Sequence, residues 1–531
     1  MNKIQVLDCT LRDGGYCNCF RFGNDNIQKI IENLIEANID IIECGFLTDN
    51  VNYDRETTQF NTVEQIVDLI PKHRSQKKFV AMMNYGEFDA DKLPRCSGET
   101  VDGIRVAFHK KNKTEALKIC EKIKNKGYSV FVQAMVSISY TDEEFLDLIR
   151  SVNEIKPYAF YIVDSFGTMK GKDLVRLFYI VEHNLDKDIV IGFHSHNNMQ
   201  LSFANAQTLL GIQTNRMLII DSSIYGMGRG SGNLNTELFV EYLNESNGCC
   251  YELNPLLRVI DEILNDFYHK TPWGYSLPNY LSASHNAHPN YARYLDDKKT
   301  LAVKDMNEIF SMMDDEKKVS FDKNYIENLY LRYMASGVVH EEHRNELLDM
   351  VTGKAVLLIA PGRSSIDEKE KIIEYSNKEN VITVSINFDY SNLDVDYIFL
   401  SNIRRFKNLD KNQRVKSIVT SNIVADNIYL QTGYRELLND EEAVSDNAGL
   451  MAIKFFVDCG AEQIYLAGFD GYSKNTSENY GDSRMEIITR NAVLDAMNAG
   501  MTRVISAYSD KIKVKFVTKP RHIVISKEKN I

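Results

Sequence analysis

The stretch IGFHSHNN at residues 191–198 decides the interpretation of the fold, because it ends an apolar run with two histidines one residue apart. Alternate side chains of a β-strand point to the same face, so His194 and His196 should project together from the strand's end. Two neutral imidazoles placed in this way can bind one divalent metal ion. A lone histidine at a strand end is more often structural, but the pair, with Gly192 before it and two asparagines after it, favours ligands.

A second polar cluster lies near the N-terminus, in VLDCTLRDGGY at residues 6–16. Arg12 and Asp13 follow directly after another apolar run, at the position where a strand would end. Asp13 could instead cap the following helix, and an adjacent arginine and aspartate often form only a surface ion pair. An acid, an arginine and a histidine pair at separate strand ends make an enzyme the leading hypothesis.

The first 245 residues alternate short apolar runs with amphipathic stretches of helical periodicity. We expect strands over 3–9, 39–46, 78–84, 102–108, 129–136, 159–164, 189–196 and 216–221. Eight strand–helix units in a segment of this length predict a (β/α)8 TIM barrel, for which about 250 residues are typical. A doubly wound open sheet would alternate in the same way, but the count of eight favours closure.

Closure would make the first strand a neighbour of the eighth, and the eighth a neighbour of the seventh. Asp13, the His194–His196 pair and Asn233, which lies in the loop after strand eight, should then share one sector of the carboxyl-end face. One carboxylate, two imidazoles and one amide oxygen suit Mn²⁺ best, with Mg²⁺, Co²⁺ or Zn²⁺ as alternatives. Asn233 is the weakest of these ligands, since an asparagine in a glycine-rich loop is as often a turn residue.

A metal ion in this site could bind a 2-oxo acid and stabilise the enolate that forms when the adjacent carbon–carbon bond breaks. Arg12, which is always protonated, could donate hydrogen bonds to the enolate oxygen. Glu43, at the end of strand two, could orient Arg12 or a metal-bound water.

The loop after strand eight, SSIYGMGRGSGNLNTE at 222–237, is rich in glycine but does not match GxGxxG, because Ser231 replaces the third glycine. Its backbone could cradle a phosphate, or it could let the chain approach the metal closely. We favour close approach, since Asn233 follows directly.

Four motifs together resemble the DRE-TIM metallolyase superfamily, which includes 4-hydroxy-2-oxovalerate aldolase, hydroxymethylglutaryl-CoA lyase and isopropylmalate synthase. They are TLRDGG (10–15), IIECGF (41–46), GFHSHNN (192–198) and GRGSGNLNTE (228–237). The resemblance covers residues 1–245 and implies a metal held by Asp13, His194, His196 and Asn233. It also implies that Arg12 stabilises the enolate and that Glu43 matches the acidic residue on strand two.

The sequence departs from the 4-hydroxy-2-oxovalerate aldolases at one position. Those enzymes carry an acid/base histidine three residues after the metal-binding aspartate, where this chain has Tyr16. An unperturbed tyrosine is a poor base at neutral pH. Tyr16 as a proton donor, His109 at the end of strand four, and a metal-bound water are therefore three open candidates.

The rest of the chain divides into a helical extension over 246–350 and a second α/β pattern over 354–531, which we interpret as a Rossmann-like domain. Residues 446–473 resemble the Rossmann-like domains of bacterial sialyltransferase-like and pterin pyrophosphokinase-like proteins. That resemblance implies a nucleotide or nucleotide-sugar ligand near Gly362, Arg363, Ser364 and Asp470. A cleft without a ligand, in a domain that only scaffolds assembly, is an equal alternative.

Composition narrows the partners of the chain. The 531 residues carry a net charge of −12, which disfavours nucleic acid and anionic membranes. We find no apolar run long enough to span a membrane. Nine cysteines without regular spacing indicate neither a disulfide framework nor a structural zinc site, and are typical of reduced thiols in the cytoplasm.

The leading hypothesis is a divalent-metal-dependent aldolase that joins or separates a pyruvate-type enolate and an aldehyde. Its expected role is the synthesis of a 2-oxo acid sugar for a surface polysaccharide. One alternative is an acyl-CoA-dependent Claisen-type synthase, and another is a nucleotide-sugar-binding scaffold with a relict barrel. We expect a homo-oligomer.

Overall fold

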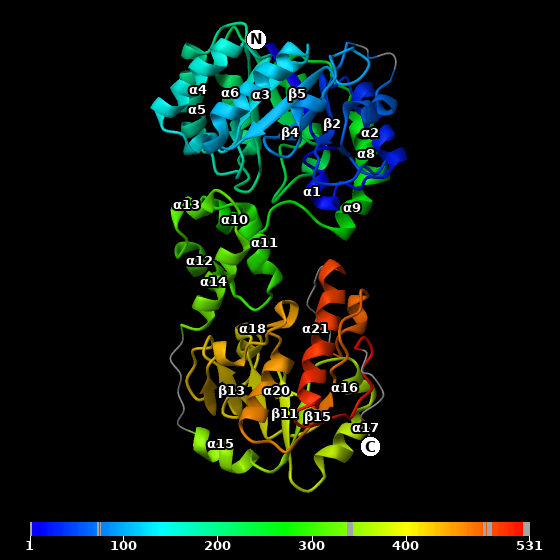
Figure 1. The fold of residues 1–531 in the computed structure, drawn as a ribbon, viewed down its shortest axis with the longest axis vertical. Helices are drawn as coiled ribbons and strands as arrows, with labels where there is room; N and C mark the ends of the chain where they lie inside the picture. The colour runs from blue at the N-terminus through cyan, green and yellow to red at the C-terminus, as the bar shows by residue number, and fades with distance from the viewer. Residues whose placement is uncertain are drawn as a thin grey trace. The chain divides into compact units, whose positions relative to one another are not determined.

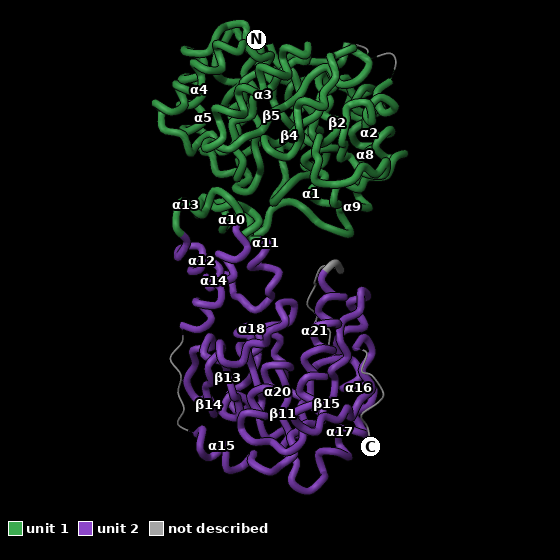
Figure 2. The backbone as a smooth tube through the Cα atoms, viewed as in Figure 1, with its two compact units in different colours: residues 1–292, 314–321 green, residues 293–313, 322–531 purple. Residues whose placement is uncertain are grey.

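The computed structural model describes residues 3–71, 74, 76–336, 343–481, 485 and 491–523. These residues form two compact units, one of residues 1–292 and 314–321 and one of residues 293–313 and 322–531 (Figure 2). Parts of the predicted second and third segments, at 337–342, 482–484, 486–490 and 524–531, lie outside the described residues.

The first unit contains a closed barrel of eight parallel strands (Figure 1). In chain order the strands are β1 (Lys3–Asp8), β2 (Ile41–Leu47), β4 (Lys78–Asn84), β5 (Gly103–Phe108), β6 (Ser129–Ala134), β7 (Ala159–Asp164), β8 (Val190–Ser195) and β9 (Met217–Ser222). The first strand, β1, pairs with β9 on one side and with β2 on the other, which closes the ring. A two-residue strand, β3 (Gln59–Phe60), pairs with β2 outside the ring. The predicted (β/α)8 barrel is therefore confirmed, and the open-sheet alternative is not observed.

Helices follow most of these strands. They are α1 (Gly15–Asn18), α2 (Asn24–Glu36), α3 (Lys113–Asn125), α4 (Asp142–Ile155), α5 (Gly171–Asn184), α6 (Ser202–Gly211) and α7 (Thr236–Asn247). The connections after β2 and β4 instead carry the 3-10 helices η1 (Val63–Leu69) and η2 (Ala90–Lys92). Helix α4 shows how the sequence specifies such an element, because Thr141 and Glu144 form a capping box at its start.

Apolar side chains fill the barrel interior below its carboxyl end. This cluster comprises Leu7, Cys9, Ile41, Val80, Phe131, Ala159, Tyr161, Val163 and Ile219. The strands are buried on both faces, as expected when helices surround a parallel barrel. The packed interior leaves the loops at the carboxyl ends as the place for polar chemistry.

The segment after the barrel is helical, as predicted. Its helices are α8 (Leu253–Val259), α9 (Asn265–Lys270), α10 (Leu277–Ser284), α11 (Pro289–Asp297), α12 (Val303–Ser311), α13 (Asp315–Lys318), α14 (Lys323–Met334) and α15 (Arg344–Val351). The two compact units share this segment, since residues up to 292 and residues 314–321 belong with the barrel.

The second unit contains a seven-stranded parallel sheet in the order β14-β13-β12-β11-β10-β15-β16. The strands are β10 (Ala355–Ile359), β11 (Val381–Ile386), β12 (Tyr397–Leu400), β13 (Ser417–Thr420), β14 (Leu430–Thr432), β15 (Gln463–Ala467) and β16 (Lys513–Phe516). Its helices are α16 (Ser364–Asp367), α17 (Lys369–Ser376), α18 (Ile403–Lys407), α19 (Lys411–Arg414), α20 (Ala448–Asp458) and α21 (Asn491–Ser509). The chain leaves β10 toward β11 and later returns on its other side as β15, so the strand order reverses at β10. No helix among the described residues is long and apolar enough to cross a membrane.

Candidate active site

Three potential metal ligands meet at the carboxyl end of the barrel. Asp13 lies in the turn after β1, His194 lies near the end of β8, and His196 follows that strand. Their ligating atoms all lie within 4.8 Å of one another, and all three side chains are buried. The closure of the barrel explains this, because β9 pairs with both β1 and β8.

Asn233 completes the group. Its amide nitrogen donates to Asp13 Oδ2 over 2.7 Å, and its backbone forms an isolated bridge with His196. Its amide oxygen Oδ1 is buried and has no hydrogen-bond partner. An orphaned buried oxygen is costly unless a ligand satisfies it, so Asn233 presents an acceptor that fits a cation.

The glycine-rich loop allows this approach. A Cβ atom at Gly228 would lie 2.3 Å from Asn233 Nδ2 and 2.7 Å from Asp13 Oδ2, closer than side chains tolerate. Gly230 and Gly232 adopt positive φ values of 68° and 82°, which glycine favours. The geometry is that of a loop packed closely against the ligand group.

The protonation states of these groups suit a cation. Burial alone would raise the pKa of Asp13, but the adjacent His196 imidazole and the charges of Arg12 and other neighbours outweigh burial and hold that pKa well below its usual range. Burial lowers the pKa of His196 to about 3, so its imidazole is neutral at neutral pH. An ionised carboxylate, the imidazoles of His194 and His196, and an unpartnered amide oxygen form a donor set that fits a divalent ion.

Arg12 is held between two carboxylates. Its Nε donates to Glu43 over 2.9 Å, and its NH1 donates to Asp13 over 2.6 Å. Burial would lower the pKa of Arg12, but Glu43 and Asp13 raise it well above its ordinary value, so the guanidinium stays charged. Its remaining nitrogen, NH2, is buried without a partner and can donate to a substrate oxygen.

A second buried arginine, which the sequence analysis missed, extends this network. Arg105 on β5 is completely buried and contacts Glu43 over 2.8 Å and the Asp221 carboxylate. Asp221 Oδ2 in turn lies 2.9 Å from His194 Nδ1, which leaves His194 Nε2 as the nitrogen available to a metal. The signal was present, because a charged residue interrupts the apolar strands GIRVAF (103–108) and MLIIDS (217–222).

Four further polar side chains interact electrostatically with the ligand group or with one another: Tyr16, His109, Arg229 and His288. The guanidinium of Arg229 lies 5.6 Å from the ring centroid of Tyr16. The charge of Arg229 contributes to lowering the pKa of both His109 and His288, after the larger effect of burial. Tyr16 and His109 were predicted from the sequence as candidate acid/base groups, whereas Arg229, in the glycine-rich loop, and His288, in the helical extension, were not.

Tyr16 and His109 have opposite proton-transfer characters. Burial, opposed in part by Arg229, raises the pKa of Tyr16, so the phenol stays protonated at neutral pH. Burial and the charge of Lys111 lower the pKa of His109, so its imidazole is neutral and keeps a lone pair. Tyr16 can therefore donate a proton, and His109 can accept one.

The residues singled out in the second domain have structural partners. Ser364 donates its backbone N–H to Asp470 Oδ2 over 2.7 Å, and their side chains are also hydrogen-bonded. Arg363 lies at the exposed start of α16, where its Nε is 3.4 Å from Asp367. A Cβ at Gly362 would meet the carbonyl oxygen of Gly468 at 2.2 Å, so this glycine permits two turns to pack together.

Two of these residues, Gly362 and Asp470, also line a pocket at the carboxyl ends of β10, β11 and β15. Polar lining side chains include Asn387, Arg405 and Asn447. The strand order reverses at β10, and ligands of open α/β sheets bind at such points.

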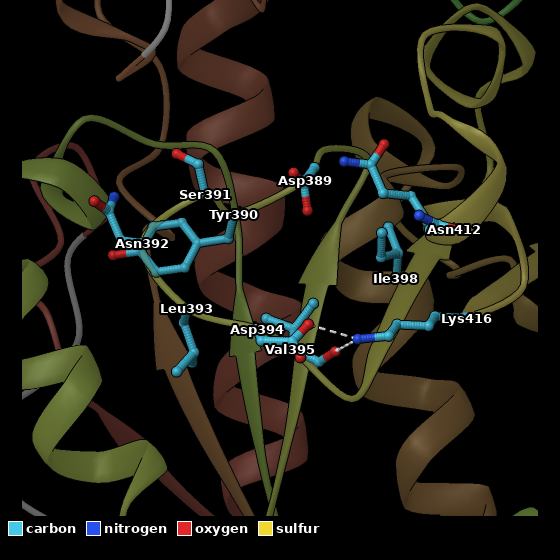
Figure 3. A pocket seen from close by; sticks show the side chains of 11 residues that line it. Asp389, Tyr390, Ser391, Asn392, Leu393, Asp394, Val395, Ile398, Asn412 and Lys416 are labelled. Atoms are coloured by element: carbon cyan, nitrogen blue, oxygen red, sulfur yellow. Dashed lines mark hydrogen bonds and ion pairs between the residues drawn. The ribbon is translucent and has the colours of Figure 1, made fainter.

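A separate pocket lies between β11 and β12, in the loop that carries Asp389 and Asp394 (Figure 3). Lys416, which lines it, is held by Asp394 over 2.6 Å and by the Val395 carbonyl over 3.1 Å. This lysine is thus occupied by protein groups, and the pocket shows no feature that points to a ligand.

Comparison with known proteins agrees with the geometry of the barrel. The HMGL-like family model matches residues 3–257. A 4-hydroxy-2-oxovalerate aldolase from Geobacillus genomosp. 3 is 27% identical over 243 residues, which cover 45% of this chain and 70% of that protein. An oxaloacetate decarboxylase from Mycobacterium tuberculosis is 24% identical over 277 residues, covering 51% of this chain and 79% of the relative.

Among solved structures, the N-terminal domain of a candidate aldolase from Bacteroides vulgatus is 29% identical, with a TM-score of 0.49, over 56% of this chain and 98% of that one. A hydroxymethylglutaryl-CoA lyase from Brucella melitensis is 13% identical with a TM-score of 0.40, over 49% and 96% of the two chains. Residues 3–257 form an HMGL-like domain of the DRE-TIM type, and the protein is a lyase.

Proposed function

We propose that the barrel is a divalent-metal-dependent aldolase that forms or cleaves a carbon–carbon bond between a pyruvate-type enolate and an aldehyde. One observation carries this proposal: an unpartnered nitrogen of Arg12 lies beside a carboxylate–imidazole–amide group that contains an unpartnered oxygen of Asn233. The names of the aldolase relatives support the same chemistry.

Asp13, His194, His196 and Asn233 would hold the metal. A divalent ion in this set would supply Lewis-acid polarisation of the keto oxygen of a 2-oxo acid. We favour Mn²⁺ because the set mixes nitrogen and oxygen donors, and Mn²⁺ accepts both in an open octahedral site.

Arg12 would stabilise the enolate. In the cleavage direction the C4 hydroxyl loses its proton, the C3–C4 bond breaks, and its electron pair becomes the pyruvate enolate, which C3 protonation then quenches. The NH2 group of Arg12 is preorganised to donate to the enolate oxygen, because Glu43 and Asp13 already fix the rest of the guanidinium. Such a donor needs no rearrangement while the charge develops.

His109 and Tyr16 would divide the proton transfers. His109 would take the hydroxyl proton through the lone pair of its neutral imidazole, and Tyr16 would deliver a proton as a phenol. Tyr16→Phe and His109→Gln should therefore each slow the aldol reaction. Wild-type rates in both variants would assign proton transfer to other groups.

The test of the proposed function is exchange of the pyruvate methyl protons with deuterium, followed by mass spectrometry of pyruvate incubated with the full chain and Mn²⁺. The wild type should exchange, and Asp13→Asn should not. Asp147→Asn is a matched control, because that carboxylate lies on the exposed surface of α4 and pairs with Arg150. A metal-loaded wild type that leaves pyruvate unlabelled would contradict the proposal.

The second domain would bind a nucleotide or nucleotide sugar in the pocket at the β10 switch point, and the aldolase would serve synthesis of a 2-oxo acid sugar for a surface polysaccharide. The position of the pocket and its polar lining support a ligand there. Titration with UDP-glucose, comparing the wild type with Asn447→Ala, checks this assignment. No disulfide bond joins the cysteines of the described residues, which is consistent with the reducing cytoplasm that we propose for the protein.

A further inference from the structure

Arg229, which is part-exposed, differs from the buried arginines of the barrel. Arg12, Arg105 and Arg216 each have a carboxylate within 2.9 Å. The structure gives Arg229 no ion pair among the residues that it describes, and its Nε is buried without a hydrogen-bond partner. A desolvated guanidinium nitrogen normally has an acceptor, so an acceptor from outside the chain is the natural partner.

The guanidinium is fixed in place without being neutralised. One terminal nitrogen, NH2, donates to the Ser165 carbonyl over 3.3 Å, and the group lies against the ring of Tyr16. These contacts position the charge in the site but offer no negative partner. Asp13 is the carboxylate that Arg229 influences, and it already contacts Arg12, His196 and Asn233.

Two groups that interact with Arg229, His288 and Tyr16, are neutral donors. His288 Nδ1 accepts the Asn290 N–H over 3.2 Å, so the neutral ring carries its proton on Nε2. Burial and the charge of Arg229 lower the pKa of His288 to about 2, which keeps the ring neutral. A cation next to neutral N–H and O–H donors is the pattern of an anion site.

Arg229 is more exposed to solvent than Arg12, the arginine that we assign to the enolate. Arg12 is only 4% exposed and contacts the metal-ligand carboxylate directly, whereas Arg229 is part-exposed on the loop that borders the site. A 2-oxo acid bound beside Arg12 would leave the region of Arg229, Tyr16 and His288 for the aldehyde partner.

We propose that Arg229 binds an anionic group, a carboxylate or a phosphate, on the aldehyde substrate. The inference rests on the proposed aldolase function and names its substrate class. In the synthetic direction pyruvate loses a methyl proton, its C3 bonds to the aldehyde carbon, and the carbonyl oxygen takes up a proton, while the anionic group stays unchanged. The product is a 4-hydroxy-2-oxo acid with a second anionic group.

The experiment compares two matched pairs of aldehydes on the full chain with Mn²⁺: glyceraldehyde 3-phosphate against glyceraldehyde, and succinic semialdehyde against butanal. Binding is measured by calorimetry with oxalate present as an unreactive enolate analogue, and turnover is measured with pyruvate. The wild type should bind the anionic member of at least one pair about ten to a hundred times more tightly, as expected for a charge-assisted contact. The pair that shows the preference identifies phosphate or carboxylate.

Arg229→Gln should abolish that preference, and Arg229→Lys should keep part of it. Arg150→Gln is the control, since Arg150 is an exposed arginine on α4. The single tryptophan, Trp273, donates to the Tyr225 carbonyl in the same loop, so unchanged fluorescence shows that the loop is intact. The inference is overturned if the wild type binds both members of each pair equally well. It is also overturned if Arg229→Gln loses the same factor of affinity for the charged and the neutral aldehydes. Failure of pyruvate exchange would instead reject the aldolase itself.

Discussion

Replacement of Asp221 tests whether the buried network controls metal binding. Its Oδ2 atom accepts from both His194 and Arg105, and its Oδ1 has no partner. In Asp221→Asn the amide oxygen can take the place of Oδ2, so the geometry at His194 can persist while the negative charge is lost. Asp221→Ala removes the charge and the acceptor together.

The two variants should therefore differ in degree. Outer partners of metal-ligating histidines typically contribute about 10- to 100-fold in metal affinity, which is roughly 1.4 to 2.8 kcal/mol. We expect about a tenfold loss in Asp221→Asn, because orientation is retained. We expect about a hundredfold loss in Asp221→Ala, because His194 can then rotate and change tautomer.

Metal affinity is best measured by calorimetric titration of the metal-free full chain with Mn²⁺, with urea unfolding in parallel. Asp102→Asn is a suitable control, since Asp102 pairs with Arg74 at the start of β5, at the opposite end of the strand from the ligands. Wild-type Mn²⁺ affinity in both Asp221 variants would show that this carboxylate does not support the metal ligand His194. Equal losses of affinity in Asp221→Ala and Asp102→Asn would contradict the prediction too, since they would indicate general destabilisation.

Three further outcomes are expected. Gly228→Ala should lower Mn²⁺ affinity at least tenfold by calorimetry, because the new Cβ would displace Asn233 or Asp13; unchanged affinity would mean that the loop yields freely. Arg12→Gln should lower the pyruvate exchange rate about 100- to 1,000-fold while Mn²⁺ remains bound, and a near-normal rate would remove its enolate role. The pKa of His288 is lowered to about 2 from 6.5, so its contribution to the free energy of unfolding is lost as pH falls below 6.5; urea unfolding of His288→Gln should show a weaker decline between pH 6.5 and 4.5, and an identical decline would contradict this.

The barrel could be predicted from sequence because its signals are local. Each strand is a short apolar run, and the chain order of eight such runs fixes which strands meet on closure. Asp13, His194, His196 and Asn233 could be predicted to lie together because they lie at or after the carboxyl ends of neighbouring strands, where side chains of a barrel converge, and the structure places them close to one another. The connections after β2 and β4 differ from the predicted pattern of one α-helix after each strand. They carry 3-10 helices instead, over residues 63–69 and 90–92.

Arg105 and Asp221 were missed for a different reason. Each lies within a strand, and sequence alone does not show whether a strand residue faces the barrel interior or the helices. Pairing register decides this, since a shift of one residue exchanges the two faces. Arg229 and His288 come from the glycine-rich loop and from a helical segment distant in sequence, and no local pattern relates such segments to each other.

The net charge of the arginines and carboxylates around the metal ligands indicates how much negative charge the substrates should bring. Arg12 and Arg105 contribute +2, and Asp13, Glu43 and Asp221 contribute −3, so the arginines and carboxylates of the network together carry −1. Arg229 brings the site to zero, and a divalent ion would bring it to +2. A net charge of +2 is unfavourable in a buried site of low dielectric constant. Two negative charges from bound substrates would cancel it. The carboxylate of a 2-oxo acid supplies one of them, so a single anionic group on the aldehyde, next to Arg229, would complete the balance.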